Sequence, residues 1–217
     1  MGKKPAAAKV PVPLKLINRV MLATVVAANI AVFAAFVATS KLALPKLDGG
    51  LGMLSTIGPA SLAAVVAGVL ADQFSPLTKA RIVYLRWADP LPGGRAFSDL
   101  GPADARVDMD SLRQRHGEVA IDAHAQNRAW FKLYKAHENK PGVLDANKQY
   151  LLYRDYAVTS LLFLIALPPL AALKVKPPSL VLAYAVCLLV QFLLVRGAAA
   201  QNGRRLVTNV LSEASHG

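Results

Sequence analysis

Residues 145–167 read DANKQYLLYRDYAVTSLLFLIAL, a polar stretch that passes without a break into an apolar one. No proline or glycine interrupts it, so the pattern predicts one continuous helix that enters a membrane-spanning segment at residues 157–173. Three tyrosines mark the level where the polar half ends: Tyr150, Tyr153 and Tyr156. Their rings favour a membrane–water interface. Arg154 and Asp155 lie at the same level, either as ordinary interfacial anchors or as the charges of a gate or an ion pair between subunits.

Three further apolar stretches have the length of a membrane span, since about 20 helical residues cross about 30 Å of hydrocarbon. They cover residues 20–39, 51–71 and 179–195. In the third span, the pair Pro168–Pro169 is expected to kink or end the helix near the far interface. The sequence therefore predicts an all-α fold with four transmembrane helices in two hairpins and a cytosolic helical insert between the second and third.

The basic residues predict the orientation. Lys and Arg number five before the first span, thirteen between the second and third, and three after the fourth, against two in each hairpin loop. By the positive-inside bias, both termini and the insert belong in the cytosol. The expected parts are a basic N-terminus (1–19), hairpin one (20–71), the insert (72–156), hairpin two (157–195) and a C-terminal tail (196–217). That tail is expected to continue after the fourth span as a short helix with a frayed end.

The insert combines thirteen basic with eleven acidic residues, which indicates a folded surface of mixed charge and not a solvated basic tail. Its first part, residues 77–90, is expected to extend the second span as a helix. That helix would be restarted after Pro76 and stopped by Pro90, and it would carry Ile82, Leu85 and Trp87.

A second helix is predicted between Asp122, as its N-cap, and the NKPG sequence at 139–142. Helical spacing places one set of residues on an apolar face: Gln126, Trp130, Leu133, Tyr134 and His137. It places three cations in a row on another face: Arg128, Lys132 and Lys135. The aromatic residues either pack in a small cytosolic core or brace a bound ligand. The cations are either solvated or bind an anion, which would be a nucleotide or a lipid headgroup.

None of the four spans holds a Lys, Arg, His, Asp or Glu side chain, which argues against a proton or substrate relay. The candidates to line a pore are the polar residues Asn29, Ser55 and Gln191. The same groups can simply join the helices of a bundle. Because four helices enclose little space, a pore would require several copies of the chain in a symmetric homo-oligomer.

The sequence holds no recognisable catalytic or metal-binding motif. His116, His124 and His137 lack the spacing of metal ligands, and no nucleophile, phosphate-binding or dinucleotide-binding loop is found. Cys187 is the sole cysteine and lies in the fourth span. We therefore expect neither an enzyme nor a bound metal or cofactor.

Three stretches of the insert, in this two-hairpin layout, carry a resemblance to a known group of proteins: RWADPLPGGRAFS (86–98), QNRAWFKLYK (126–135) and YLLYRDYA (150–157). The chain resembles bacterial membrane effectors of anti-phage defence, among them the channel subunit of the Hailong type, which is paired with a nucleotidyltransferase. The resemblance implies an oligomeric ion channel that senses a nucleotide or DNA oligomer and depolarises the infected cell. The alternative is a non-conducting membrane anchor that recruits a soluble partner through the same insert.

Overall fold

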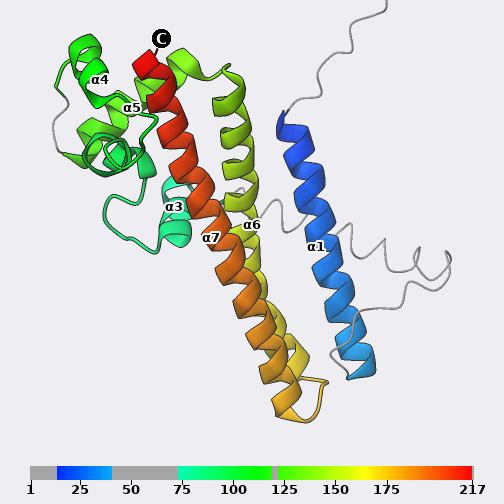
Figure 1. Cartoon of the computed structure of the whole chain (residues 1–217). Helices are drawn as coiled ribbons and strands as arrows, with labels where there is room; N and C mark the ends of the chain where they lie inside the picture. The colour runs from blue at the N-terminus through cyan, green and yellow to red at the C-terminus, as the bar shows by residue number, and fades with distance from the viewer. Residues whose placement is uncertain (1–13, 41–72, 119–121, 217) are drawn as a thin grey trace, which may run out of the picture.

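The computed structural model describes residues 14–40, 73–118 and 122–216, and every secondary-structure element within these ranges is helical (Figure 1). In chain order the elements are α1 (Leu14–Thr39), α3 (Pro76–Tyr84), the 3₁₀-helix η1 (Pro92–Arg95), the π-helix η2 (Ala96–Leu100), α4 (Met109–His116), α5 (Ala123–His137), α6 (Pro141–Ala172) and α7 (Pro178–His216).

Among the described residues, three helices are long and apolar enough to cross a membrane: α1 over Asn18–Thr39, α6 and α7. They correspond to the first, third and fourth predicted spans. The second predicted span, residues 51–71 with Ser55, lies outside the described residues. In Figure 1, α1 and α6 run in the same direction and α7 returns beside them. The pair Pro168–Pro169 does not end α6, which continues to Ala172.

The apolar part of these three helices has its own core. Phe36 and Val26 from α1 pack with Phe163 and Leu167 of α6, and the Phe36 ring stacks on Tyr184 of α7 at a centroid distance of 4.8 Å. The large apolar side chains on the outer faces of α6 and α7, and Leu173 directly after α6, are exposed: Ile165, Leu170, Leu173, Leu182, Val186, Leu189, Val190, Leu193 and Leu194. An apolar core inside a still apolar outer face is typical of helices surrounded by lipid.

The remaining helices form a helical unit, by which we mean α3, η1, η2, α4 and α5 with the ends of α6 and α7 that pack on them. Its core joins Trp130 and Leu133 of α5 with Val143 of α6. The largest contribution comes from α7, whose residues 206–211 are all buried. The prediction that the chain stays helical after residue 196 is confirmed, but the expected short helix with a frayed end is wrong, because the segment continues α7 to His216 as the central helix of the unit.

Side-chain caps explain where the helices of the unit begin. Ser75, Asp108 and Asp122 each accept a hydrogen bond from the backbone N–H three residues later, at 2.8–3.1 Å. The cap predicted at Asp122 is confirmed. The helix predicted over 77–90 is shorter than expected, because Leu85 adopts a left-handed conformation (φ 49°) that ends α3 at Tyr84. Trp87 consequently lies on an exposed loop and not on a helix.

Candidate functional site

An ion cluster joins the helical unit to the apolar bundle, by which we mean α1 and the apolar parts of α6 and α7. The Lys79 Nζ of α3 lies 2.9 Å from Oδ1 of Asp155 on α6, and the Arg154 guanidinium contacts the same oxygen at 2.9 Å. The Lys79 side chain is only 6% exposed and that of Asp155 26%. We call Lys79, Arg154 and Asp155 the junction cluster. Arg154 and Asp155, predicted as interfacial or gate charges, thus form an ion pair within one chain whose third member the sequence did not reveal.

The same level of the fold holds a close crossing of α3, α6 and α7. A Cβ atom built at Gly203 of α7 would overlap the Tyr84 hydroxyl and lie 2.9 Å from the ring of Tyr150. Arg196 Nη1 donates a hydrogen bond of 3.0 Å to the carbonyl oxygen of Val83, near the end of α3. Burial raises the pKa of the Tyr84 hydroxyl above that of a free tyrosine. Together these contacts hold α3 between the two long helices.

Polar contacts also join the helices inside the apolar part. Gln191 Nε2 of α7 donates a hydrogen bond of 3.0 Å to the hydroxyl of Tyr156 on α6, and the Asn29 side chain of α1 lies against that hydroxyl. Asn29 Nδ2 itself donates to the carbonyl oxygen of Val25 within α1, at 2.9 Å. Asn29 and Gln191, two of the three predicted pore residues, thus both lie at the Tyr156 hydroxyl within one chain. Polar contacts of this kind join helices in membrane bundles.

The apolar face of α5 packs in the core. Trp130 is 9% exposed, and its ring lies so close to Gly93 of η1 that a Cβ atom there would come within 2.7 Å of Trp130 Cε3. It stacks on Tyr134 at a centroid distance of 5.6 Å. A base therefore cannot stack on Trp130 in this conformation. The aromatic side chain that α5 does expose is Phe131, at 50%; its spacing from Arg128 and Lys135 (i+3 and i−4) was readable in the sequence.

The cations of α5 differ in their surroundings. Lys135 Nζ lies 2.8 Å from Oε2 of Glu138, and this hydrogen bond raises the pKa of Lys135. Arg128 and Lys132 are exposed and have no ion-pair partner among the described residues. We call Arg128, Lys132 and the neighbouring Phe131 the α5 cationic face. It offers two uncompensated charges beside an exposed ring.

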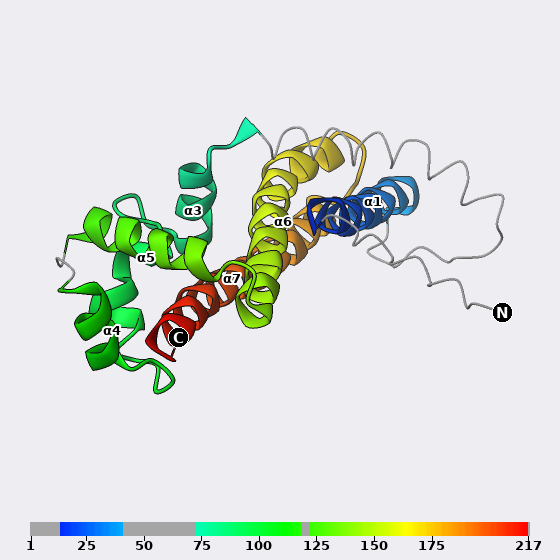
Figure 2. The same ribbon diagram turned by 90° about the horizontal axis from the view of Figure 1, so that it is seen from above.

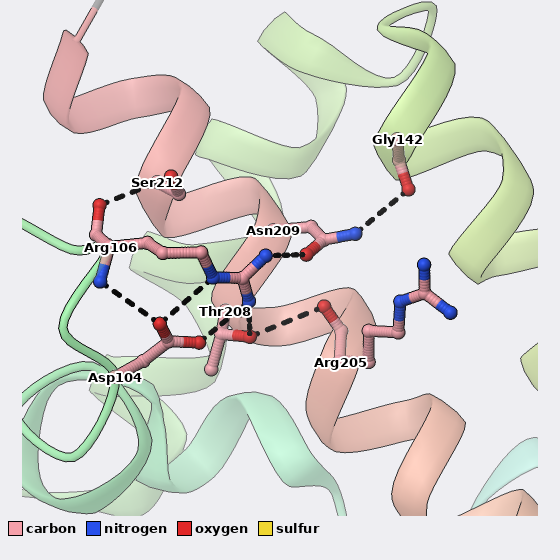
Figure 3. A network of polar contacts seen from close by, with 7 residues as sticks. All are labelled: Asp104, Arg106, Gly142, Arg205, Thr208, Asn209 and Ser212. Carbon is pink, nitrogen blue, oxygen red and sulfur yellow. Dashed lines mark hydrogen bonds and ion pairs between the residues drawn. The ribbon is translucent and has the colours of Figure 1, made fainter.

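A further network closes the far end of the unit (Figure 3). The Arg106 guanidinium binds Asp104 through two hydrogen bonds of 2.7 and 3.0 Å, and also donates to Thr208 and to Asn209 of α7. Asn209 Nδ2 donates to the carbonyl oxygen of Gly142 at the start of α6, at 2.9 Å. We call Asp104, Arg106, Thr208 and Asn209 the C-terminal clamp. It connects the loop after η2 to both long helices. It was missed in the sequence, where only the run of polar side chains at 208, 209 and 212 suggests it.

None of the protein-family models, curated proteins or solved structures compared with the chain matches it.

Metal-ligating side chains are dispersed in the part of the chain that the structure describes. It contains no group of three or more His, Cys, Asp or Glu residues placed to hold a metal ion. His137 contacts the carbonyl oxygen of Leu133 within α5, and His124 Nε2 lies 3.7 Å from Asp89.

The clamp predicts a dependence of stability on pH. The hydrogen bonds from Arg106 hold the pKa of Asp104 well below that of a free carboxyl group. A carboxylate whose pKa is lowered by folding stabilises the folded state above its unfolded pKa of about 4, and this stabilisation is lost as the pH falls toward the folded value. We expect Asp104→Asn to lower the free energy of unfolding by about 1 kcal/mol at neutral pH. The difference from wild type should shrink below about pH 4.

Denaturant titrations of the protein in mild detergent, at several pH values, measure this difference. The control is Asp110→Asn, because the Asp110 side chain is 84% exposed in a surface pair with Arg113. That change should cost less than about 0.5 kcal/mol at neutral pH. A wild-type advantage over Asp104→Asn that is the same at every pH would contradict the prediction.

Proposed function

We propose that this chain is one subunit of an oligomeric membrane channel, or of a membrane-disrupting effector, that is gated by its cytosolic helical unit. The observation that carries the proposal is the continuity of α6 and α7, which run from the apolar bundle into the unit without a break. The buried end of α7 is the central helix of that unit. A rearrangement there would move rigid helices whose other ends lie in the bilayer.

We propose that an anionic ligand binds the α5 cationic face. Arg128 and Lys132 supply charges for phosphates, and Phe131 supplies a ring on which a base can stack. Trp130 and Tyr134 support this surface from behind. A nucleotide or DNA oligomer made by a partner nucleotidyltransferase fits this chemistry. Gating requires only that the ligand bind the open and closed states with different affinity.

The topology that we propose has four crossings, with both termini and the unit in the cytoplasm, in the inner membrane of a bacterium. Figure 1 shows that α1 ends far from the helical unit, beside the end of α6, whereas α3 begins within the unit. Residues 51–71 hold an apolar stretch long enough to make the return. The proposed role in antiviral defence is carried by the resemblance of the three insert stretches, and phage challenge of bacteria that express the chain tests it.

The alternative is a non-conducting anchor that recruits a soluble partner. The contact between Asn29, Tyr156 and Gln191 favours it, because these polar groups bind one another within a single chain. Purified protein in liposomes distinguishes the two functions. A channel releases a trapped fluorescent ion indicator under some ligand condition, whereas an anchor leaves the vesicles sealed.

Charge reversal on α5 tests the ligand surface. We expect Arg128→Glu/Lys132→Glu to abolish any effect of a short single-stranded DNA oligonucleotide on ion flux through liposomes, since two attractive charges become repulsive. Lys135→Gln should change that effect less than twofold, because Glu138 already neutralises Lys135. The matched control is Arg113→Glu/Arg115→Glu on α4, which makes the same change of charge elsewhere on the unit. If the Arg128→Glu/Lys132→Glu variant still responds to the oligonucleotide, Arg128 and Lys132 are only solvated and do not bind the ligand.

A further inference from the structure

The loop that follows α3 exposes large apolar side chains. Trp87 is 82% exposed and Leu85 is 61% exposed, although both residue types are normally well buried. We call residues 85–91, between α3 and η1, the Trp87 loop. Two of its residues, Leu85 and Asp89, have positive φ angles of 49° and 44° without being glycine. Such conformations cost free energy and persist where the surroundings impose them, so the backbone of the loop follows a defined course at these two residues.

Basic groups surround the exposed indole. The Arg81 guanidinium lies 5.8 Å from the centre of the Trp87 ring, and its Nε donates a hydrogen bond of 3.3 Å to the Trp87 carbonyl oxygen. Arg86, the residue that precedes Trp87, is also exposed. The one acidic residue of the loop, Asp89, lies 3.7 Å from His124 of α5. An amphipathic ring flanked by arginines suits the level of phosphates and glycerol at the surface of an anionic bilayer.

The fold sets the depth of this loop. Lys79 and Val83 tie α3 to Asp155 and Arg196, the charged residues that border the apolar stretches of α6 and α7. Figure 1 shows the loop on the side of the helical unit that faces the apolar part of the bundle. Seen from above in Figure 2, α3, α4 and α5 lie to one side of α6 and α7 and do not cap them. A bilayer around the long helices would therefore run beneath the unit and meet the loop.

We propose that the Trp87 loop docks on the anionic bilayer surface, with Trp87 and Leu85 among the headgroups and Arg81 and Arg86 on lipid phosphates. This proposal rests on the membrane-spanning part of the proposed function. It adds a second, peripheral attachment that holds the unit against the bilayer, so that a ligand on α5 acts on a unit fixed at two points.

Fluorescence of Trp87 tests the docking, because Trp130 is the only other tryptophan. Trp130→Phe leaves Trp87 as the sole indole. Subtracting the spectrum of Trp87→Phe from that of wild type isolates the same signal if Trp130→Phe folds poorly. In liposomes containing phosphatidylglycerol we expect the Trp87 emission to shift to the blue relative to detergent. Lipids brominated near the headgroup should quench it strongly, and aqueous iodide weakly.

Arginine substitutions test the charge contribution. Adding phosphatidylglycerol to phosphatidylcholine vesicles should increase the blue shift of Trp87. Arg86→Gln should remove much of this increase. Arg115→Gln on α4, an exposed arginine distant in sequence from the loop, is the matched control and should leave it intact.

Three results would overturn the docking: emission typical of water with full quenching by iodide, a blue shift that brominated lipid does not quench, or equal effects of the two arginine variants. The second would mean that protein, such as another copy of the chain, covers the indole. Alkaline extraction of the same liposomes separates this failure from that of the proposed function. A chain that stays in the vesicles with Trp87 in water lacks only the docking, whereas a chain that is extracted does not span the bilayer.

Discussion

Asp155→Ala should lower the free energy of unfolding by about 3–5 kcal/mol, because it leaves Lys79 charged and without its carboxylate partner at the junction. The Lys79 side chain is 6% exposed and its Nζ lies 2.9 Å from Asp155. Water can reach a buried ammonium group only if α3 moves away from α6. The loss should therefore be accompanied by separation of α3 from the long helices, which faster proteolysis in the α3–η1 loop detects.

Two further variants make this prediction specific. Lys79→Met/Asp155→Leu replaces the pair by apolar groups and should recover part of the loss, since it removes the buried Lys79 charge, although Arg154, 16% exposed, still loses its carboxylate partner. Asp99→Ala is the surface control: Asp99 pairs with Arg95 at i,i+4 and is 53% exposed, so its removal should cost less than about 0.5 kcal/mol. Unfolding in mild detergent, followed by circular dichroism, measures all three. Equal stability of Asp155→Ala and wild type would mean that the junction cluster is solvated and does not join the unit to the bundle.

Substitution by alanine at two glycines of α7 should change the free energy of unfolding in opposite directions. Gly203→Ala places a methyl group against the Tyr84 hydroxyl and the Tyr150 ring, where the three helices cross. Overpacking of this kind lowers the free energy of unfolding by about 1–3 kcal/mol. A methyl group at Gly197 has no atom within 4 Å, so Gly197→Ala should gain about 0.5–1 kcal/mol from helix propensity.

Both glycine variants change only one methyl group in one helix, so each serves as the control for the other. Thermal unfolding of the two purified variants in the same detergent measures the difference. If Gly203→Ala is as stable as Gly197→Ala, the close approach of α3, α6 and α7 is not part of the folded state. A Tyr84→Phe change in the Gly203→Ala background should restore part of the lost stability, because it removes the hydroxyl that the methyl group overlaps.

These two sites also bear on the proposed gating. Lys79 lies in the middle of the short helix α3 and Tyr84 is its last residue, and this helix contacts both long helices. A ligand on α5 can influence the spans only through such packed contacts or through α7 itself. Variants that loosen the junction while the unit stays folded should therefore reduce the response to ligand and leave ligand binding to the α5 cationic face unchanged.

Local patterns in the sequence were sufficient for several parts of the fold. Uninterrupted apolar runs identified three long helices, since a helix in lipid needs only length and apolar side chains. Asp122 identified the start of α5, because capping depends on residues within one turn. Helical spacing also placed Gln126, Trp130 and Leu133 on the buried face of that helix.

The contacts between distant segments were decided by the tertiary structure alone. Asp155 pairs with Lys79, which lies 76 positions away in the sequence, and Arg106 donates a hydrogen bond to Asn209, 103 positions away. Residues after Arg196 look like a tail in the sequence because their apolar residues are spaced among polar ones, yet they form the central helix of the unit once α4, α5 and α6 cover them. Hydropathy and helical period determine which segments are helices and which faces are apolar, whereas the partner of each face and of each charge depends on how the helices pack.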